Sequence, residues 1–177
     1  MPSRTEKARV DQEAYNAIFA TSKVMRQAIT GLFLDEGITE PQFMALGLLV
    51  SSGSMLMRKM SKDMLVTPAN VTGIVDRLEE KKLAKRASVK GDRRATVVEI
   101  TAEGRALYER VALKKAAMVQ KALATFTREE LMTLRDLLER FQKEMAASTG
   151  DRQQAIRPLK SPGSLTRLGA FRSSGNT

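Results

Sequence analysis

The sequence predicts a mainly α-helical chain of the α+β class, in which one small β-hairpin interrupts a series of helices. Apolar residues recur at steps of three or four over most of the chain, which is the period of an amphipathic helix. Two capping boxes, Thr39–Gln42 and Thr127–Glu130, each mark the start of a helix. A segment rich in β-branched residues, 95–100, follows a basic turn that contains Gly91, as expected of a hairpin.

Local signals set the expected order of the elements. Thr67 and Pro68 suit the cap and the first residue of a helix. The Ser- and Gly-rich residues 51–54 end the helix that starts after Thr39. We expect helices at residues 8–34, 40–50, 58–65, 68–81, 102–125 and 128–147, and strands at 55–57, 83–89 and 95–100.

The composition excludes several classes of function. The 177 residues suit one domain with its own core, and they include neither Cys nor His. Disulfides and thiolate metal sites are therefore excluded, and the commonest acid–base catalyst is missing. Since no glycine-rich phosphate loop or cluster of acidic residues stands out, we expect no enzyme, no cofactor and no metal site.

No segment of the sequence predicts a membrane partner. The longest apolar run, Phe43–Val50, is far shorter than the ~20 residues that cross a bilayer. The N-terminal residues lack the apolar core of a signal peptide. A soluble cytoplasmic protein is the expectation.

The positive charge is concentrated in two segments. The net charge is +10; residues 58–94 hold 11 Lys/Arg against 5 Asp/Glu, and residues 150–177 hold 5 against 1. The rest of the chain is neutral, with 14 residues of each kind. Concentrated positive charge indicates a polyanionic partner, and an ordinary solvated surface is the alternative.

Two short helices joined by a tight turn and followed by a hairpin form a winged helix-turn-helix, expected over residues 39–101. In the second of these helices, which we call the reading helix, the apolar residues Val71, Ile74, Val75 and Leu78 share one face. The opposite face is small and polar, as a helix in the DNA major groove requires. A solvated face is the alternative, but such faces usually carry many Lys and Glu. The residues expected to contact DNA here are Thr67, Pro68, Ala69, Asn70, Thr72, Gly73 and Arg77.

The hairpin, which we call the wing, carries a second basic cluster. A wing beside a major-groove helix can place an arginine in the adjacent minor groove, where the negative potential is strong. Asp92 is expected to orient Arg94 rather than to contact DNA. A generic basic turn would be the alternative if this cluster stood alone. The wing residues expected at the DNA are Lys85, Arg86, Lys90, Asp92, Arg93 and Arg94.

The helices outside the winged core predict a dimer. Residues 8–34 and 102–147 carry apolar stripes that the core cannot cover alone, so a two-fold partner is expected to cover them. Such a dimer places its reading helices about 34 Å apart and predicts a palindrome with half-sites about 10 bp apart. Residues 1–148 would form this domain, and the basic residues 149–177 a disordered tail.

Several short motifs resemble those of the MarR family of regulators, in the same order and spacing over roughly residues 10–146. The resemblance implies a homodimer that binds palindromic operators in double-stranded DNA, usually as a repressor, and is often released by a small molecule. It also implies that Arg94 enters the minor groove and that Asp92 holds it. The motifs are Ile38–Phe43, Thr67–Thr72, Val75–Glu79, Leu83–Arg86, Asp92–Arg94 and Ile100–Gly104.

The sequence departs from the family pattern near the reading helix. The family often has Gly where this chain has Leu65 and Lys82, and Glu-Leu-Ala where it has Lys59-Met60-Ser61. A left-handed conformation at Lys82 would cost about 1 kcal/mol. The junctions between the helices are therefore expected to differ in detail, while the fold is kept.

The expected function is a ligand-responsive transcriptional repressor that binds a palindromic operator with sequence specificity as a homodimer. The small-molecule effector would lie between the dimer helices and the winged core, against Phe19, Met44 and Met118, although core packing also explains these residues. The alternative is an architectural protein that binds DNA or RNA through charge alone. The stacking aromatic residues typical of single-strand binders are absent from the basic residues 58–94.

Overall fold

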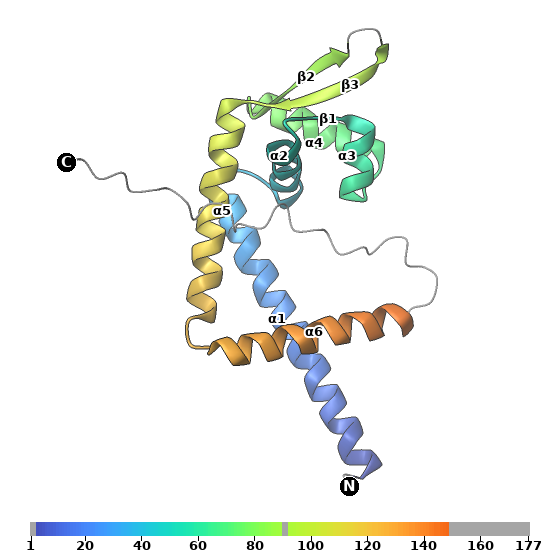
Figure 1. Cartoon of the computed structure of the whole chain (residues 1–177), viewed down its shortest axis with the longest axis vertical. Coiled ribbons are helices and arrows are strands. Elements are labelled where there is room, and N and C mark those ends of the chain that lie inside the picture. The colour runs from blue at the N-terminus through green and yellow to red at the C-terminus, as the bar shows by residue number, and fades with distance from the viewer. Residues whose placement is uncertain (1–2, 90–91, 149–177) are drawn as a thin grey trace, which may run out of the picture.

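The computed structural model describes residues 3–89 and 92–148 and confirms the mainly helical α+β class. The elements follow the predicted order (Figure 1). Within these residues the helices are α1 (Arg4–Asp35), α2 (Glu40–Ser52), α3 (Met57–Met64), α4 (Pro68–Glu80), α5 (Ala102–Leu123) and α6 (Arg128–Ser148), and the strands are β1 (Ser54–Leu56), β2 (Ala84–Val89) and β3 (Asp92–Ile100).

Local capping residues determine where the helices begin. Thr39 and Gln42 form the predicted capping box, since the side chain of each accepts a backbone N–H of the other. Thr127 and Glu130 form the second one at the start of α6. Helix α1 begins at Arg4 and not at residue 8, because the Ser3 hydroxyl accepts the N–H of Glu6 at 3.2 Å and caps an earlier turn.

Three antiparallel strands lie in the order β1-β3-β2. Strand β1 pairs Met55 with Val98, and it connects α2 directly to α3. Met57 was predicted to end this strand but is instead the first residue of α3. The extended Leu56 precedes it as the cap (φ −63°, ψ 135°), so the chain turns one residue earlier than the apolar run Met55–Met57 indicates.

The hairpin departs from its predicted bounds at β3. Ser88 pairs with Thr96, whereas the next residue, Val89, pairs with Asp92. β3 therefore has three extra residues between these pairs, which makes an irregular, bulge-like register. The prediction that β3 begins at Ala95 is wrong, because the bulge allows Asp92 to join the ladder.

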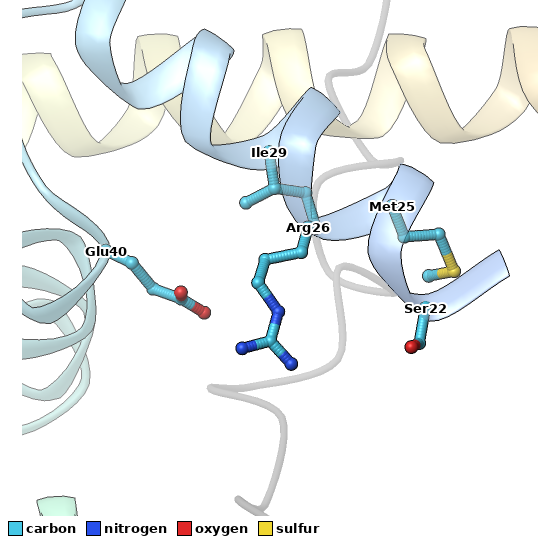
Figure 2. Close-up of a pocket in the computed structure, with 5 residues that line it drawn as sticks. All are labelled: Ser22, Met25, Arg26, Ile29 and Glu40. Carbon is cyan, nitrogen blue, oxygen red and sulfur yellow. The ribbon is translucent and has the colours of Figure 1, made fainter. Parts of the chain in front are cut away.

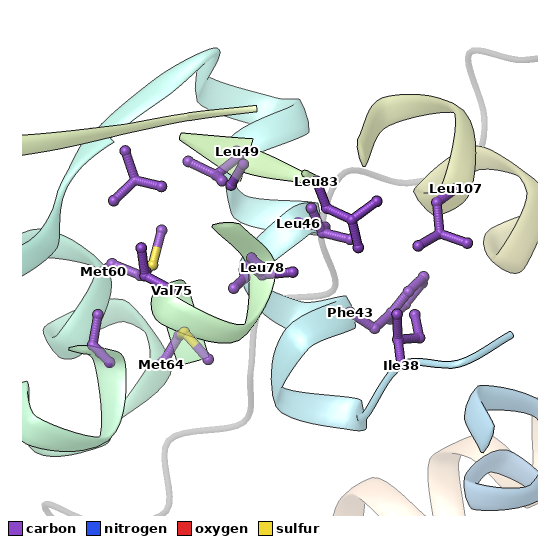
Figure 3. Packing of buried hydrophobic residues seen from close by; sticks show 14 of the residues in the cluster. Ile38, Phe43, Leu46, Leu49, Met60, Met64, Val75, Leu78, Leu83 and Leu107 are labelled. Atoms are coloured by element: carbon purple, nitrogen blue, oxygen red, sulfur yellow. The ribbon is translucent and has the colours of Figure 1, made fainter. Parts of the chain in front are cut away.

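One apolar core holds the sheet against α2, α3 and α4. Its buried side chains come from each of these elements and converge between the helices, as Figure 3 shows. Helix α6 contributes no buried residue, and α1 contributes only Phe33. The long outer helices thus extend away from a small, well-packed core (Figure 1).

An aromatic cluster joins the core to the outer helices. The Phe33 ring of α1 lies 5.0 Å from the Phe43 ring of α2, which in turn lies 4.9 Å from the Tyr108 ring of α5. A Cβ atom at Gly47 would lie 3.0 Å from the Tyr108 ring, so the small residue lets α5 approach α2 closely. This packing fixes the ends of α1 and α5 beside the winged core.

Both departures from family glycines fall on strained backbone. Leu65 has φ +56° after α3 and Lys82 has φ +58° after α4. Lys82 therefore has the left-handed conformation whose cost was considered above. Each position carries a side chain where glycine would have no steric cost, at about 1 kcal/mol apiece.

Candidate nucleic-acid interface

The reading helix α4 is oriented by its buried face. Val71, Val75 and Leu78 are fully buried in the core, and Ile74 is half-buried beside them. Thr67 caps the helix by accepting the N–H of Asn70 at 3.2 Å. With the buried face fixed in this way, the opposite face has one defined direction.

The opposite face is exposed along its whole length. All seven residues that the sequence assigned to DNA contact are exposed: Thr67, Pro68, Ala69, Asn70, Thr72, Gly73 and Arg77. We call these residues the reading face. The Thr72 hydroxyl donates to the Pro68 carbonyl at 3.1 Å, which leaves its oxygen as an acceptor. The Arg77 guanidinium pairs with Glu80 at 2.8 Å on the same helix, and the hydrogen bond raises the pKa of Arg77.

Gly73 has open space around it. A Cβ atom built there meets no atom within 4 Å, and the backbone is helical without a positive φ. The packing of the chain therefore does not require glycine at this position. A surface that approaches the α4 backbone would benefit from it.

Arg86 is engaged inside the domain. Its Nη2 lies 2.6 Å from Asp76 Oδ1, its Nη1 pairs with Glu79, and its backbone N–H donates to Glu79 Oε1 at 2.7 Å. Its side chain is only 29% exposed. Arg86 thus connects β2 to α4, and its charge is balanced by two carboxylates of the reading helix.

Among the other wing residues, the side chain of Lys85 is described, whereas only the backbone is described for Asp92, Arg93 and Arg94. Lys85 remains 64% exposed, although its Nζ lies 3.2 Å from Glu99 on the neighbouring strand. The backbone of Asp92, Arg93 and Arg94 belongs to β3. Their side chains, together with Lys90, lie outside the described residues, so the expected minor-groove contact of Arg94 stays a prediction.

Two basic residues of α3 were missed as individual candidates. Arg58 and Lys62 are exposed one helical turn apart, and no ion-pair partner is recorded for either among residues 3–89 and 92–148. The neighbouring Lys59 pairs with Asp63 at 3.2 Å. The signal was present in the sequence, because these residues lie opposite the buried Met60 and Met64.

A shallow hollow lies between α1 and α2. It has a volume of about 420 Å³ and combines two apolar residues with a hydroxyl and two opposite charges (Figure 2). None of the predicted pocket residues lines it: Phe19 is exposed on α1, and Met44 and Met118 are half-buried on α2 and α5. The residues that do line it are Ser22, Met25, Arg26, Ile29 and Glu40.

The outer helices leave many large apolar side chains exposed. Helix α6 has no buried residue although it carries four large exposed apolar side chains. Those on α1 include Tyr15 and Phe19, whose rings stack at 6.4 Å. Those on α6 are Met132, Leu134, Leu137 and Met145.

Neither a metal-binding cluster nor a membrane-spanning helix is found among the described residues. In the ranges 3–89 and 92–148 no group of three or more acidic residues is placed to hold a metal ion. The helices of the same ranges are too short or too polar to cross a membrane.

The fold and the reading face together define a winged-helix DNA-binding protein. Comparison with known proteins identifies its family. Residues 38–96 match the model of the MarR family. The chain is 30% identical over 122 residues to the HTH-type transcriptional repressor MdtR of Bacillus subtilis, covering 69% of this chain and 77% of that protein. The chain belongs to the MarR family, whose members are DNA-binding transcriptional regulators and not enzymes.

Further relatives and solved structures agree with this assignment. The homoprotocatechuate degradative operon repressor of Escherichia coli is 31% identical over 104 residues, or 59% of this chain and 70% of that protein. The YusO protein of Bacillus subtilis superposes with a TM-score of 0.66 at 25% identity, over 80% of this chain and 99% of that one. A MarR mutant of Escherichia coli complexed with operator DNA shares the fold, with a TM-score of 0.60 at 23% identity over 71% and 91% of the chains.

Proposed function

We propose that the chain represses transcription by binding a palindromic operator as a homodimer through the reading face of α4. The observation that carries this is the contrast between the two faces of α4: the apolar face packs into the core, and the reading face is small, polar and exposed. A MarR structure with operator DNA and two relatives named as repressors support the proposal.

The homodimer is supported by the uncovered outer helices. Helix α6 exposes a row of large apolar side chains and packs none of them in the core of its own chain. A single chain would leave this surface in water, and a two-fold partner would bury it.

The effector proposal rests on the hollow between α1 and α2. Arg26 and Glu40 line it together with the apolar Met25 and Ile29 (Figure 2). A small molecule with a charged group would match this lining. A bound molecule here would contact both an outer helix and the first helix of the winged core, so it can couple the two.

The wing and α3 supply the remaining contacts in this proposal. Lys85, Lys90, Arg93 and Arg94 lie on the wing, and Arg58 and Lys62 lie on α3. Phosphate contacts from such residues position the protein, while the reading face reads the bases.

Selection of bound fragments from random double-stranded DNA with the full chain tests the proposal. We expect one palindrome, with half-sites about 10 bp apart and a preference of about 10³-fold or more over unrelated duplexes. Equal binding to all duplexes, with a steep loss of affinity as salt rises, would instead show an architectural protein.

A further inference from the structure

The C-terminal end of α4 is bonded to the start of α5. The Leu83 N–H donates to the Leu78 carbonyl at 2.8 Å and ends the helix. Thr101, the cap of α5, then donates its hydroxyl to the Lys82 carbonyl at 2.8 Å and its N–H to the Leu83 carbonyl at 3.2 Å. The reading helix is thus attached at its far end to one of the long outer helices.

The same end of α4 also reaches α1, through one side chain. Lys81 is the C-terminal cap residue of α4, and its Nζ donates to the carbonyl of Gly37. Gly37 follows α1 in a left-handed conformation (φ +66°), and its own N–H returns to the Leu34 carbonyl at 2.9 Å. The ammonium of Lys81 therefore joins the reading helix to the end of α1, the other long outer helix.

Neighbouring contacts make the end of α1 a fixed point. The Glu36 side chain is only 6% exposed and accepts Arg110 Nε at 3.0 Å and Lys114 Nζ, both from α5. The hydrogen bonds from Lys114 and Arg110 hold the pKa of Glu36 below its usual value. A carboxylate next to the C-terminus of α1 is unfavourable for the helix dipole, and the two cations compensate it.

We propose that Lys81 is a positioning residue for operator recognition. Its bond helps to fix the angle between the reading helix and the outer helices α1 and α5. This inference rests on the proposed function, since the outer helices set the separation of two reading helices only in a dimer. The bond is exposed and contributes little to stability, so its removal leaves the fold intact but takes away the direct link between α4 and the end of α1.

Half-site spacing measures this angle. One added base pair moves a half-site by about 3.4 Å along the DNA and rotates it by about 34°. A rigid dimer tolerates neither change, whereas a dimer with a loosened joint tolerates both better. Spacing preference therefore separates a positioning role from an ordinary contribution to affinity.

The experiment uses the full chain and three duplexes made from the palindrome that the wild type selects, with the centre shortened by one base pair, unchanged or lengthened by one. Lys81→Met is compared with Lys82→Met, which removes the same charge from the next residue. The structure records no partner for the Lys82 ammonium among the described residues; the bonds of Lys82 are made by its backbone, whose N–H donates to the Glu79 carbonyl and whose carbonyl accepts the Thr101 hydroxyl.

We expect the wild type and Lys82→Met to share a sharp preference for the unchanged spacing. In Lys81→Met this preference should fall about threefold or more, the size of a moderate loss of coupling, and Lys81→Arg should restore it by replacing the donor. Thermal unfolding confirms that each variant is folded, and if Lys81→Met is not, Lys81→Gln takes its place in the same comparison.

If Lys81→Met and Lys82→Met showed the same preference among the three spacings, this inference would be overturned, and the proposed function would stand. A proportional loss of affinity by Lys81→Met on all three duplexes, accompanied by a smaller salt dependence, would have the same consequence, because this identifies a phosphate contact. A wild type that selects no palindrome would overturn the proposed function as well.

Discussion

Gly73 separates the requirements of the fold from those of DNA binding. Because a Cβ atom there meets open space, Gly73→Ala should stabilise α4 by about 0.5–1 kcal/mol. On the reading face the added methyl group would hold the DNA away, and we expect a loss of about 1–3 kcal/mol in operator binding. Thermal unfolding and titration with the selected duplex measure the two effects.

Gly31 offers a matched control for this substitution. It lies in α1, and a Cβ atom there also meets no atom within 4 Å. Gly31→Ala should give a similar gain in stability without the loss in DNA affinity. If both variants bound the operator equally well, Gly73 would not lie at the DNA.

Arg94 tests the wing directly. Arg94→Ala should weaken operator binding by about 1–3 kcal/mol if its guanidinium enters the minor groove. The dimer should stay folded, because a single contact with DNA contributes nothing to the free protein. An unchanged affinity in a filter-binding or fluorescence titration would remove the wing from the interface.

Arg86 is expected to be a structural residue, and Lys85 is expected to contact DNA. Arg86→Gln leaves Asp76 and Glu79 uncompensated, and we expect a loss of stability of about 1–2 kcal/mol, reduced by partial exposure. Lys85→Gln should leave stability unchanged and lower the slope of log affinity against log salt by about one. A loss of slope in both variants would mean that Arg86 also contacts phosphate.

Among the elements, the start of α5 packs directly on the chain that leaves α4. A Cβ atom at Gly104 would lie 1.9 Å from the Leu83 carbonyl oxygen, which is backbone and cannot rotate away. Gly104→Ala should therefore destabilise the protein by about 1–3 kcal/mol, although the same change usually stabilises a helix. Urea denaturation measures it, and an unchanged midpoint would mean that α5 shifts freely.

The elements that local rules determine could be predicted from the sequence. The capping boxes at Thr39 and Thr127 act within one helical turn, so the starts of α2 and α6 follow from adjacent residues. The start of β3 could not be predicted in this way. It depends on the pairing of Val89 with Asp92 across a bulge, which composition does not encode.

The candidate site shows the same division. The reading face follows from helical periodicity, because Val71, Val75 and Leu78 identify the buried side. The partners of Arg86 belong to another element, and the hollow at Arg26 and Glu40 depends on how α1 meets α2. Contacts between elements of this kind need the tertiary structure.

At the scale of the whole molecule, the exposed apolar surface of the outer helices favours a dimer over a monomer. α6 buries no residue in its own chain, yet Leu134 is 41% exposed along a row of similar side chains. A stable two-fold interface needs more than about 1,000 Å² of buried surface. The long helices α1, α5 and α6 can supply this area only when two chains share it.

A charge placed on this surface should therefore dissociate the dimer. Leu134→Glu would put a carboxylate into the interface. Lys143→Glu would put a carboxylate on the opposite face of α6, because the nine residues between the two positions make about two and a half helical turns. In light scattering we expect the wild type and Lys143→Glu to be dimers, and Leu134→Glu to dissociate at micromolar concentration with a concentration-dependent melting temperature. Its operator affinity should fall steeply, because one reading helix then binds one half-site. If Leu134→Glu remained a dimer with full affinity, α6 would face solvent and the two-fold contact would have to involve α1 and α5 alone.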